Sequence, residues 1–220
     1  IDLAFRIFCE PGKDKVLTFT PTYGMYNVSA NINNIEVIEQ PLINDFRINL
    51  NQLQPYLDFE EVKIIFICSP NNPTGNSLNP EDIEYILENF NGIVIVDEAY
   101  IDFSAQASFI KNIDKYDNLI VSQTFSKAWG LAGVRVGVAY ASQAIIAFYN
   151  RVKPPYNVST LNQKAVLNSL NNLEEVTQNI DTILDERAKL KDALIKLDIV
   201  KKIYPTDANF LLVEVDDANK

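Results

Sequence analysis

Short runs of apolar residues recur along the chain, and between them apolar residues repeat every three or four positions. Runs rich in Ile and Val are typical of strands buried on both faces of a sheet, whereas a spacing of three or four is typical of amphipathic helices. The expected strands cover residues 16–20, 35–39, 63–68, 93–97, 119–124 and 135–141. Their alternation with helices predicts an α/β fold, with a mainly parallel sheet flanked by helices.

Two helices can be delimited from the sequence. A helix is expected over residues 80–90, because Pro80 suits the first helical position and the acidic residues after it favour a helix N-terminus. A second helix is expected from the first residue to Pro11–Gly12, where apolar residues at 3, 4, 7 and 8 follow helical spacing.

The pattern changes after Pro154–Pro155. Apolar residues then follow helical spacing over a long stretch, with a break expected near Asn171–Asn172, and the segments KKIYP and NFLLVEV read as strands. We therefore expect a large ligand-binding domain over 1–160, a long connecting helical region over 161–198, and the beginning of a smaller α+β domain over 199–220. The last residues, DDANK, read as the start of another helix, and with Ile1 in place of Met they indicate a fragment of a longer polypeptide.

Composition narrows the class of ligand. The chain has 220 residues, 47% of them hydrophobic, and a net charge of −10 without a long basic run, which argues against nucleic acid or an anionic membrane as partner. It has no histidine, and its two cysteines lack CxxC spacing, so a zinc site or a Ser-His-Asp triad is excluded and a reducing cytoplasm fits best. No apolar run reaches the roughly 18 residues of a membrane span. Small molecules are the expected ligands.

Ligands of open α/β sheets bind at the carboxyl ends of the strands, so the residues after each run are the candidates. There the chain reads SPNNPTGN, EAYIDF and FSKAWGLAGVR. Asp97 ends a buried run, a costly place for a carboxylate without a cation. Lys127 lies among core-type residues, so its ammonium is expected near apolar atoms, where a desolvated amine becomes a nucleophile.

Simpler readings of the same residues stay open. Lys127 and Arg135 could be ordinary surface charges, and Asp97 could cap a helix or bridge to Lys127. Thr124 and Ser126 could be turn hydroxyls, and SPNNPTGN a polar turn.

Taken together, these segments resemble the fold type I aminotransferases that use pyridoxal 5′-phosphate. The resemblance rests on NPTG (72–75), DEAY (97–100), and Ser126–Lys127 with Arg135 eight residues later. It extends to the histidinol-phosphate aminotransferases in particular, through segments spread over nearly the whole chain: PTYGMY, CSPNNPTGN, VDEAYIDF, TFSKAWGLAGVRVG, VKPPYNVS and DANFLLV. Three motifs in this order at strand ends are far more specific than any one of them.

The resemblance implies which residues take part in catalysis. Lys127 would carry the cofactor as a Schiff base and move the proton between substrate and cofactor carbons. Asp97 would pair with the pyridinium nitrogen, which lets the ring accept electrons. Tyr100, together with Asn72, would hydrogen-bond the phenolic oxygen of the ring.

The remaining cofactor contacts are implied in the same way. Thr124, Ser126 and Arg135 would contact the phosphate, which a planar guanidinium and short hydroxyls suit. Tyr23 would stack on the cofactor ring.

The resemblance also implies an activity, in which an amino group moves between histidinol phosphate and glutamate or 2-oxoglutarate in histidine biosynthesis, in a cytoplasmic homodimer. Three alternatives stay open: an aromatic aminotransferase, an amino-acid-phosphate decarboxylase, and a non-catalytic cofactor-binding regulatory domain. The family's phosphate-binding glycine loop, partner-subunit arm and carboxylate-binding arginine are expected outside the 220 residues.

Overall fold

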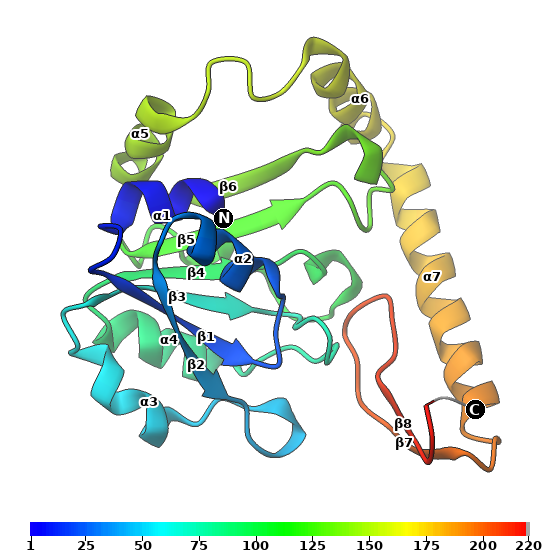
Figure 1. Ribbon diagram of the computed structural model, residues 1–220. Coiled ribbons are helices and arrows are strands. Elements are labelled where there is room, and N and C mark those ends of the chain that lie inside the picture. The colour runs from blue at the N-terminus through cyan, green and yellow to red at the C-terminus, as the bar shows by residue number, and fades with distance from the viewer. Residues whose placement is uncertain (219–220) are drawn as a thin grey trace.

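The computed structural model describes residues 1–218 and contains a six-stranded sheet flanked by helices (Figure 1). The strands lie in the order β2-β1-β3-β4-β5-β6. The first five are parallel and β6 is antiparallel to β5. This confirms the prediction of a mainly parallel sheet. The bounds are β1 Lys15–Thr20, β2 Glu36–Pro41, β3 Val62–Cys68, β4 Ile93–Asp97, β5 Leu119–Thr124 and β6 Gly137–Ala141.

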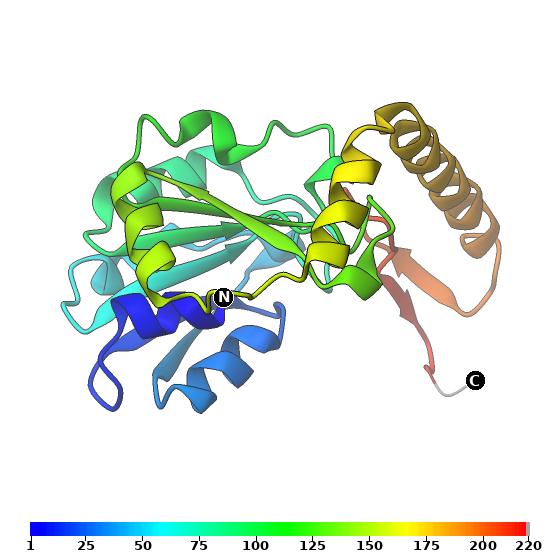
Figure 2. The ribbon, with the colours of Figure 1, turned by 90° about the horizontal axis from the view of Figure 1, so that it is seen from above.

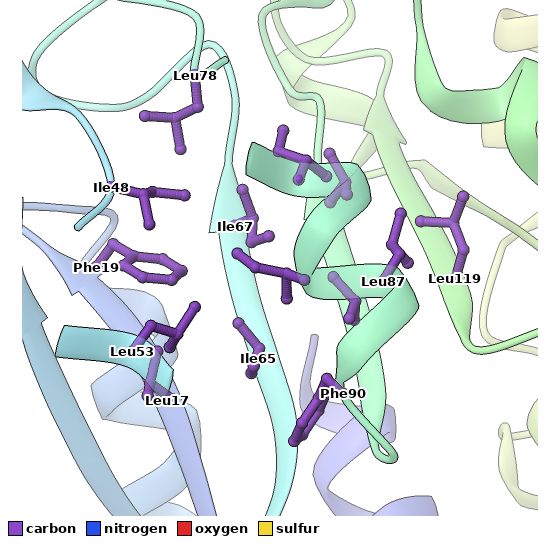
Figure 3. Packing of buried hydrophobic residues seen from close by; sticks show 14 of the residues in the cluster. Leu17, Phe19, Ile48, Leu53, Ile65, Ile67, Leu78, Leu87, Phe90 and Leu119 are labelled. Carbon is purple, nitrogen blue, oxygen red and sulfur yellow. The ribbon is translucent and has the colours of Figure 1, made fainter. Parts of the chain in front are cut away.

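One face of the sheet is covered by α3 (Leu50–Leu57) and α4 (Pro80–Asn89). Pro80 occupies the start of α4, and the Asn79 side chain caps it by accepting from the Glu81 amide, which satisfies an amide that has no partner within the helix. The apolar side of α4 then packs against the sheet: Figure 3 shows Leu87 beside Leu119 of β5, in the same cluster as Ile65 and Ile67 of β3. This layer is the larger part of the core.

The opposite face is covered by α1 (Asp2–Phe8), α2 (Met25–Ile32) and α5 (Gln143–Val152). Phe5 of α1 and Tyr26 of α2 both stack on Phe66 of β3, with ring centroids 5.3 and 4.7 Å apart. The central strands are thus buried on both faces, which explains why their sequences are almost continuously apolar.

Residues 160–218 lie beside the sheet rather than on it (Figures 1 and 2). Two helices, α6 (Thr160–Leu170) and α7 (Leu173–Leu194), are separated at Asn171–Asn172, as predicted. The antiparallel strands β7 (Val200–Ile203) and β8 (Val213–Val215) follow. A small cluster that includes Tyr100, Ala128 and Ala208 packs against α7 and connects this part to the loops of the sheet. The domain limits at 160 and 198 remain predictions.

Two predictions about local structure differ from the structure itself: the start of β6 and a helix at the C-terminal end of the chain. Strand β6 begins at Gly137 rather than at residue 135, because Arg135 adopts a left-handed conformation with φ of 52° and cannot continue a strand. The predicted helix at 216–220 is not formed at 216–218, and residues 219–220 lie outside the described residues. Within residues 1–218, no helix is both long and apolar enough to cross a membrane.

Candidate active site

A cavity of about 650 Å³ opens at the carboxyl ends of the parallel strands. Strand order reverses between β1 and β3, and such a switch point is where open α/β sheets bind ligands. The cavity is lined by every residue for which the sequence predicts a role: Tyr23, Asn72, Asp97, Tyr100, Thr124, Ser126, Lys127 and Arg135. The fold therefore gathers residues from four strand ends, although their roles in binding remain predictions.

Asp97 is the buried acid of the cavity. It ends β4 with only 7% of its surface exposed, and its Oδ2 accepts a hydrogen bond of 2.9 Å from the Tyr26 hydroxyl. Burial raises the pKa of the Asp97 carboxyl, and the hydrogen bond from Tyr26 opposes that rise. A cationic group placed in the cavity would be drawn to this carboxylate.

The NPTG loop places Asn72 beside Tyr100. The Asn72 Nδ2 lies 3.4 Å from the hydroxyl oxygen of Tyr100, which is itself buried and packs edge-on against Phe210. The preceding residue, Asn71, fixes the loop: its Nδ2 donates to the Pro21 carbonyl and to Thr74 Oγ1, and its Oδ1 accepts from Thr22. The loops after β1 and β3 are thereby held together, which sets the place of Tyr23 relative to Asn72.

The prediction that the Lys127 amine is desolvated is wrong. Its side chain is exposed, and of the apolar residues around it only Ala128 is buried. The connection from β5 to β6 packs against α6 and α7 through Val134 and Ala128, but Lys127 lies where this connection opens onto the cavity. The Lys127 Nζ lies 5.2 Å from the centre of the Tyr100 ring, within reach of a cation–π attraction, and it lines the cavity.

The predicted phosphate contacts lie together after β5. Thr124 Oγ1 accepts from the Ser126 amide at 3.1 Å and donates to Ser126 Oγ at 2.9 Å, so these residues do act as turn hydroxyls while lining the cavity. Arg135 is exposed and donates to the Ala132 carbonyl at 3.1 Å. Among residues 1–218, neither Lys127 nor Arg135 has an ion-pair partner, and the bridge from Asp97 to Lys127 considered above is not formed.

Several cavity residues were not found from the sequence. One side of α5 and the chain after it contributes Ile146, Tyr149, Asn150, Lys153 and Asn157. The spacing of 146, 149, 150 and 153 follows one face of a helix, which is a readable signal. The sequence does not show, however, whether this face lines the cavity or packs against the sheet.

The donor set fits pyridoxal phosphate in kind. A buried carboxylate suits a ring nitrogen that carries a proton, a tyrosine hydroxyl and an amide suit a phenolate oxygen, and a guanidinium with hydroxyls suits a phosphate. Among residues 1–218, three basic side chains, Lys127, Arg135 and Lys153, share the cavity with one acidic side chain, Asp97. In a chain of net charge −10, this local excess of cations indicates an anionic ligand.

Comparison with known proteins identifies the family. The profile of the family Aminotransferase class I and II matches residues 1–219. Histidinol-phosphate aminotransferases from Christiangramia forsetii and Flavobacterium johnsoniae are 54% and 50% identical over the whole chain, which spans 63% of their length. The resemblance found from the motifs is thus confirmed.

Solved structures agree on the fold. A putative histidinol-phosphate aminotransferase from Erwinia carotovora atroseptica is 25% identical, with a TM-score of 0.89 over 98% of this chain and 64% of that one. The enzyme of the same name from Sinorhizobium meliloti, solved in complex with pyridoxal-5′-phosphate, shares the fold with a TM-score of 0.86 at 20% identity, over 98% of this chain and 59% of its own. With the profile match along almost its entire length, the chain belongs to the class I and II aminotransferase family.

Proposed function

We propose that the protein carrying this chain is a pyridoxal-phosphate-dependent histidinol-phosphate aminotransferase, which exchanges an amino group between histidinol phosphate and 2-oxoglutarate in histidine biosynthesis. The observation that carries the proposal is the placement of an exposed amine, Lys127, and a buried carboxylate, Asp97, in one cavity with Arg135. The names of the relatives at 54% and 50% identity support the choice of substrate. A cytoplasmic homodimer is part of the same proposal.

Each side chain has a distinct task in this function. When bound, the cofactor supplies an aldehyde for amines and a ring that withdraws electrons from the substrate carbon. The Lys127 Nζ is the base that takes and returns the substrate's proton, since it lines the cavity and has no ion-pair partner among residues 1–218. Asp97 holds a negative charge where a ring nitrogen must stay protonated. Opposite charges at about 4 Å attract by about 4 kcal/mol at an effective dielectric of about 20.

The remaining residues orient the ligands. Asn72 and Tyr100 present an amide and a hydroxyl side by side, which suits a phenolic oxygen. Ser126 and Arg135 lie where a phosphate can meet a hydroxyl and a guanidinium. Lys153 adds a second cation at the α5 side of the cavity, which favours substrates that themselves carry an anionic group.

The substrate is tested by comparing kcat/KM for histidinol phosphate, phenylalanine and tyrosine with 2-oxoglutarate as acceptor. We expect histidinol phosphate to exceed the others by up to about 10⁴-fold, because polar groups placed for a phosphate stay unpaired with an analogue that lacks one. Equal values for the three would instead indicate a general aromatic aminotransferase. Release of CO₂ from an amino-acid phosphate would indicate a decarboxylase.

The attachment of the cofactor is tested separately. After incubation with pyridoxal phosphate and reduction with borohydride, peptide mapping should find the label on Lys127. In Lys127→Ala the label and transamination should both be lost. Lys153→Ala is the matched control, because it removes another amine from the same cavity and should leave Lys127 labelled. A label on Lys153 in the wild type would refute the assignment of Lys127.

A further inference from the structure

Tyr26 is a buried residue beside the cavity. Neither the sequence motifs nor the proposed function assigns it a role. It lies on α2, within the PTYGMY segment, and its side chain is 0% exposed. Its ring stacks on Phe66 at 4.7 Å and meets the edge of the Tyr23 ring at 5.7 Å. Its hydroxyl donates to Asp97 Oδ2 at 2.9 Å, across 71 positions of sequence.

A buried phenol must have a hydrogen-bond partner, because burying a hydroxyl without one costs free energy. The partner it has is the acid of the cavity. A hydrogen bond to an ionised carboxylate is about twice as strong as one between neutral groups, and it favours the charged form of the acid. With its ring stacked on Phe66 and edge-on to Tyr23, Tyr26 places its hydroxyl at the carboxyl ends of β3 and β4, where it donates to Asp97 and lies near the Cys68 thiol.

We propose that Tyr26 is a positioning residue of this site: its hydroxyl holds the Asp97 carboxylate charged and oriented for the ligand. The inference rests on the proposed function, since the ligand it serves is the protonated ring nitrogen of pyridoxal phosphate. Tyr26 does not line the cavity and acts only through Asp97. Its loss should therefore change the ionisation of Asp97 even when no cofactor is bound.

Other groups near Asp97 could also affect the pH at which it titrates. Cys68 on β3 and Ser122 on β5 are its register partners. Burial raises the pKa of the Tyr26 hydroxyl well above its usual range and that of the Cys68 thiol to about 12, so both stay neutral where a carboxyl titrates.

The first test uses the cofactor-free protein. Carboxyl ¹³C resonances of labelled aspartate are followed against pH, and Asp97 is assigned by its loss in Asp97→Asn. Tyr26→Phe keeps the ring and its packing but removes the donor, so the Asp97 titration should move to higher pH by about one to two units. Tyr116→Phe is the matched control: Tyr116 is 7% exposed and donates to Glu84 and Glu88 on the other layer, and its loss should leave Asp97 unchanged.

The second test measures the affinity for pyridoxal phosphate by titration at neutral pH and below. Tyr26→Phe should weaken binding by about 10- to 100-fold, and the loss at low pH should begin at a higher pH than in the wild type. In the Asp97→Asn background the same change should cost less than about threefold, because a double-mutant cycle isolates an effect that passes through one partner. Melting temperatures of all variants show that they are folded.

The outcomes separate the two proposals. An unshifted Asp97 titration in folded Tyr26→Phe, or equal losses of affinity in both backgrounds, would overturn the role of Tyr26. Absence of cofactor binding in the wild type would refute the proposed function instead, and the ¹³C titration would still decide whether Tyr26 controls Asp97.

Discussion

Two neighbouring carboxylates, Asp97 and Glu98, are both buried, but the structure uses them differently. Glu98 accepts from the Ser108 hydroxyl, the Phe109 amide and the Gln123 amide at 2.6 to 2.9 Å, so its charge is compensated within the fold. Asp97 faces the cavity; the Tyr26 hydroxyl donates to its Oδ2, and the Ser122 side chain and the Ala99 backbone also favour its charged form. Burial raises the pKa of each. Of the two, only Asp97 lines the cavity, so it is the carboxylate available to a cationic ligand.

Replacing Asp97 with Asn tests this difference. The change keeps the shape but removes the charge, so transamination should fall by orders of magnitude, while the free energy of unfolding stays within about 1 kcal/mol or rises, because an isolated buried carboxylate is costly. Single-turnover rates and urea unfolding measure the two effects. Glu98→Gln is the control and should show the opposite: lower stability, with the rate per folded molecule largely kept. Near wild-type turnover in Asp97→Asn would exclude the proposed role.

At the scale of elements, the loops after the strands are held by each other and by the C-terminal segment. The Asp207 amide donates to the Gly75 carbonyl at 2.7 Å, and the Ser77 amide donates to Asp207 Oδ2 at 3.0 Å. Arg187 of α7 donates to the Ala208 carbonyl in the same segment. The loop that carries Asn72 is therefore held by residues at least 130 positions away in sequence.

Gly75 is the position in this loop where the close contact with the C-terminal segment requires a glycine. Its φ is +82°, and a Cβ there would lie 2.5 Å from Thr206 Oγ1. Gly75→Ala should lower the free energy of unfolding by roughly 2–4 kcal/mol, from backbone strain and the clash together, as measured by urea denaturation. Gly130→Ala is the matched control: φ is +67° with nothing within 4 Å, so only strain of about 1 kcal/mol is expected. Equal effects at the two positions would contradict the close approach to Thr206.

At the scale of the whole molecule, protons retained by buried groups make stability depend on pH. Burial raises the pKa values of Cys68, Cys9 and Tyr149 each to about 12. In the unfolded chain a thiol ionises near pH 8.5 and a phenol near pH 10, roughly. Between these values and about 12 the unfolded state has released protons that the folded state retains. The free energy of unfolding must therefore fall as pH rises through this interval.

The expected result is a urea midpoint that is steady near pH 8 and declines from about pH 9 to 12. Cys68→Ser removes one of the titrating groups, because a serine hydroxyl does not ionise in this range, and should make the decline shallower. The measurement is equilibrium unfolding at a series of pH values with both proteins. A midpoint independent of pH up to 11, or the same slope in Cys68→Ser, would show that burial does not hold these protons.

The sequence by itself determined the features that depend on local pattern. Apolar runs predicted the six strands of the sheet: β3 and β4, buried on both faces, are almost continuously apolar, and the edge strands β2 and β6 still hold shorter apolar runs. Asn171–Asn172 marked the end of α6. The motifs placed Asn72, Asp97 and Lys127 at strand ends, and parallel strands carry their ends to one edge.

Only the tertiary structure decided which side chains face each other and which are covered. Lys127 is exposed because it lies where its connection opens onto the cavity. Tyr26 reaches Asp97 and α5 faces the cavity because separate elements pack in one order. Periodicity gives the apolar face of each element but not the neighbour against which that face packs, and the neighbour is chosen by the packing of the whole chain.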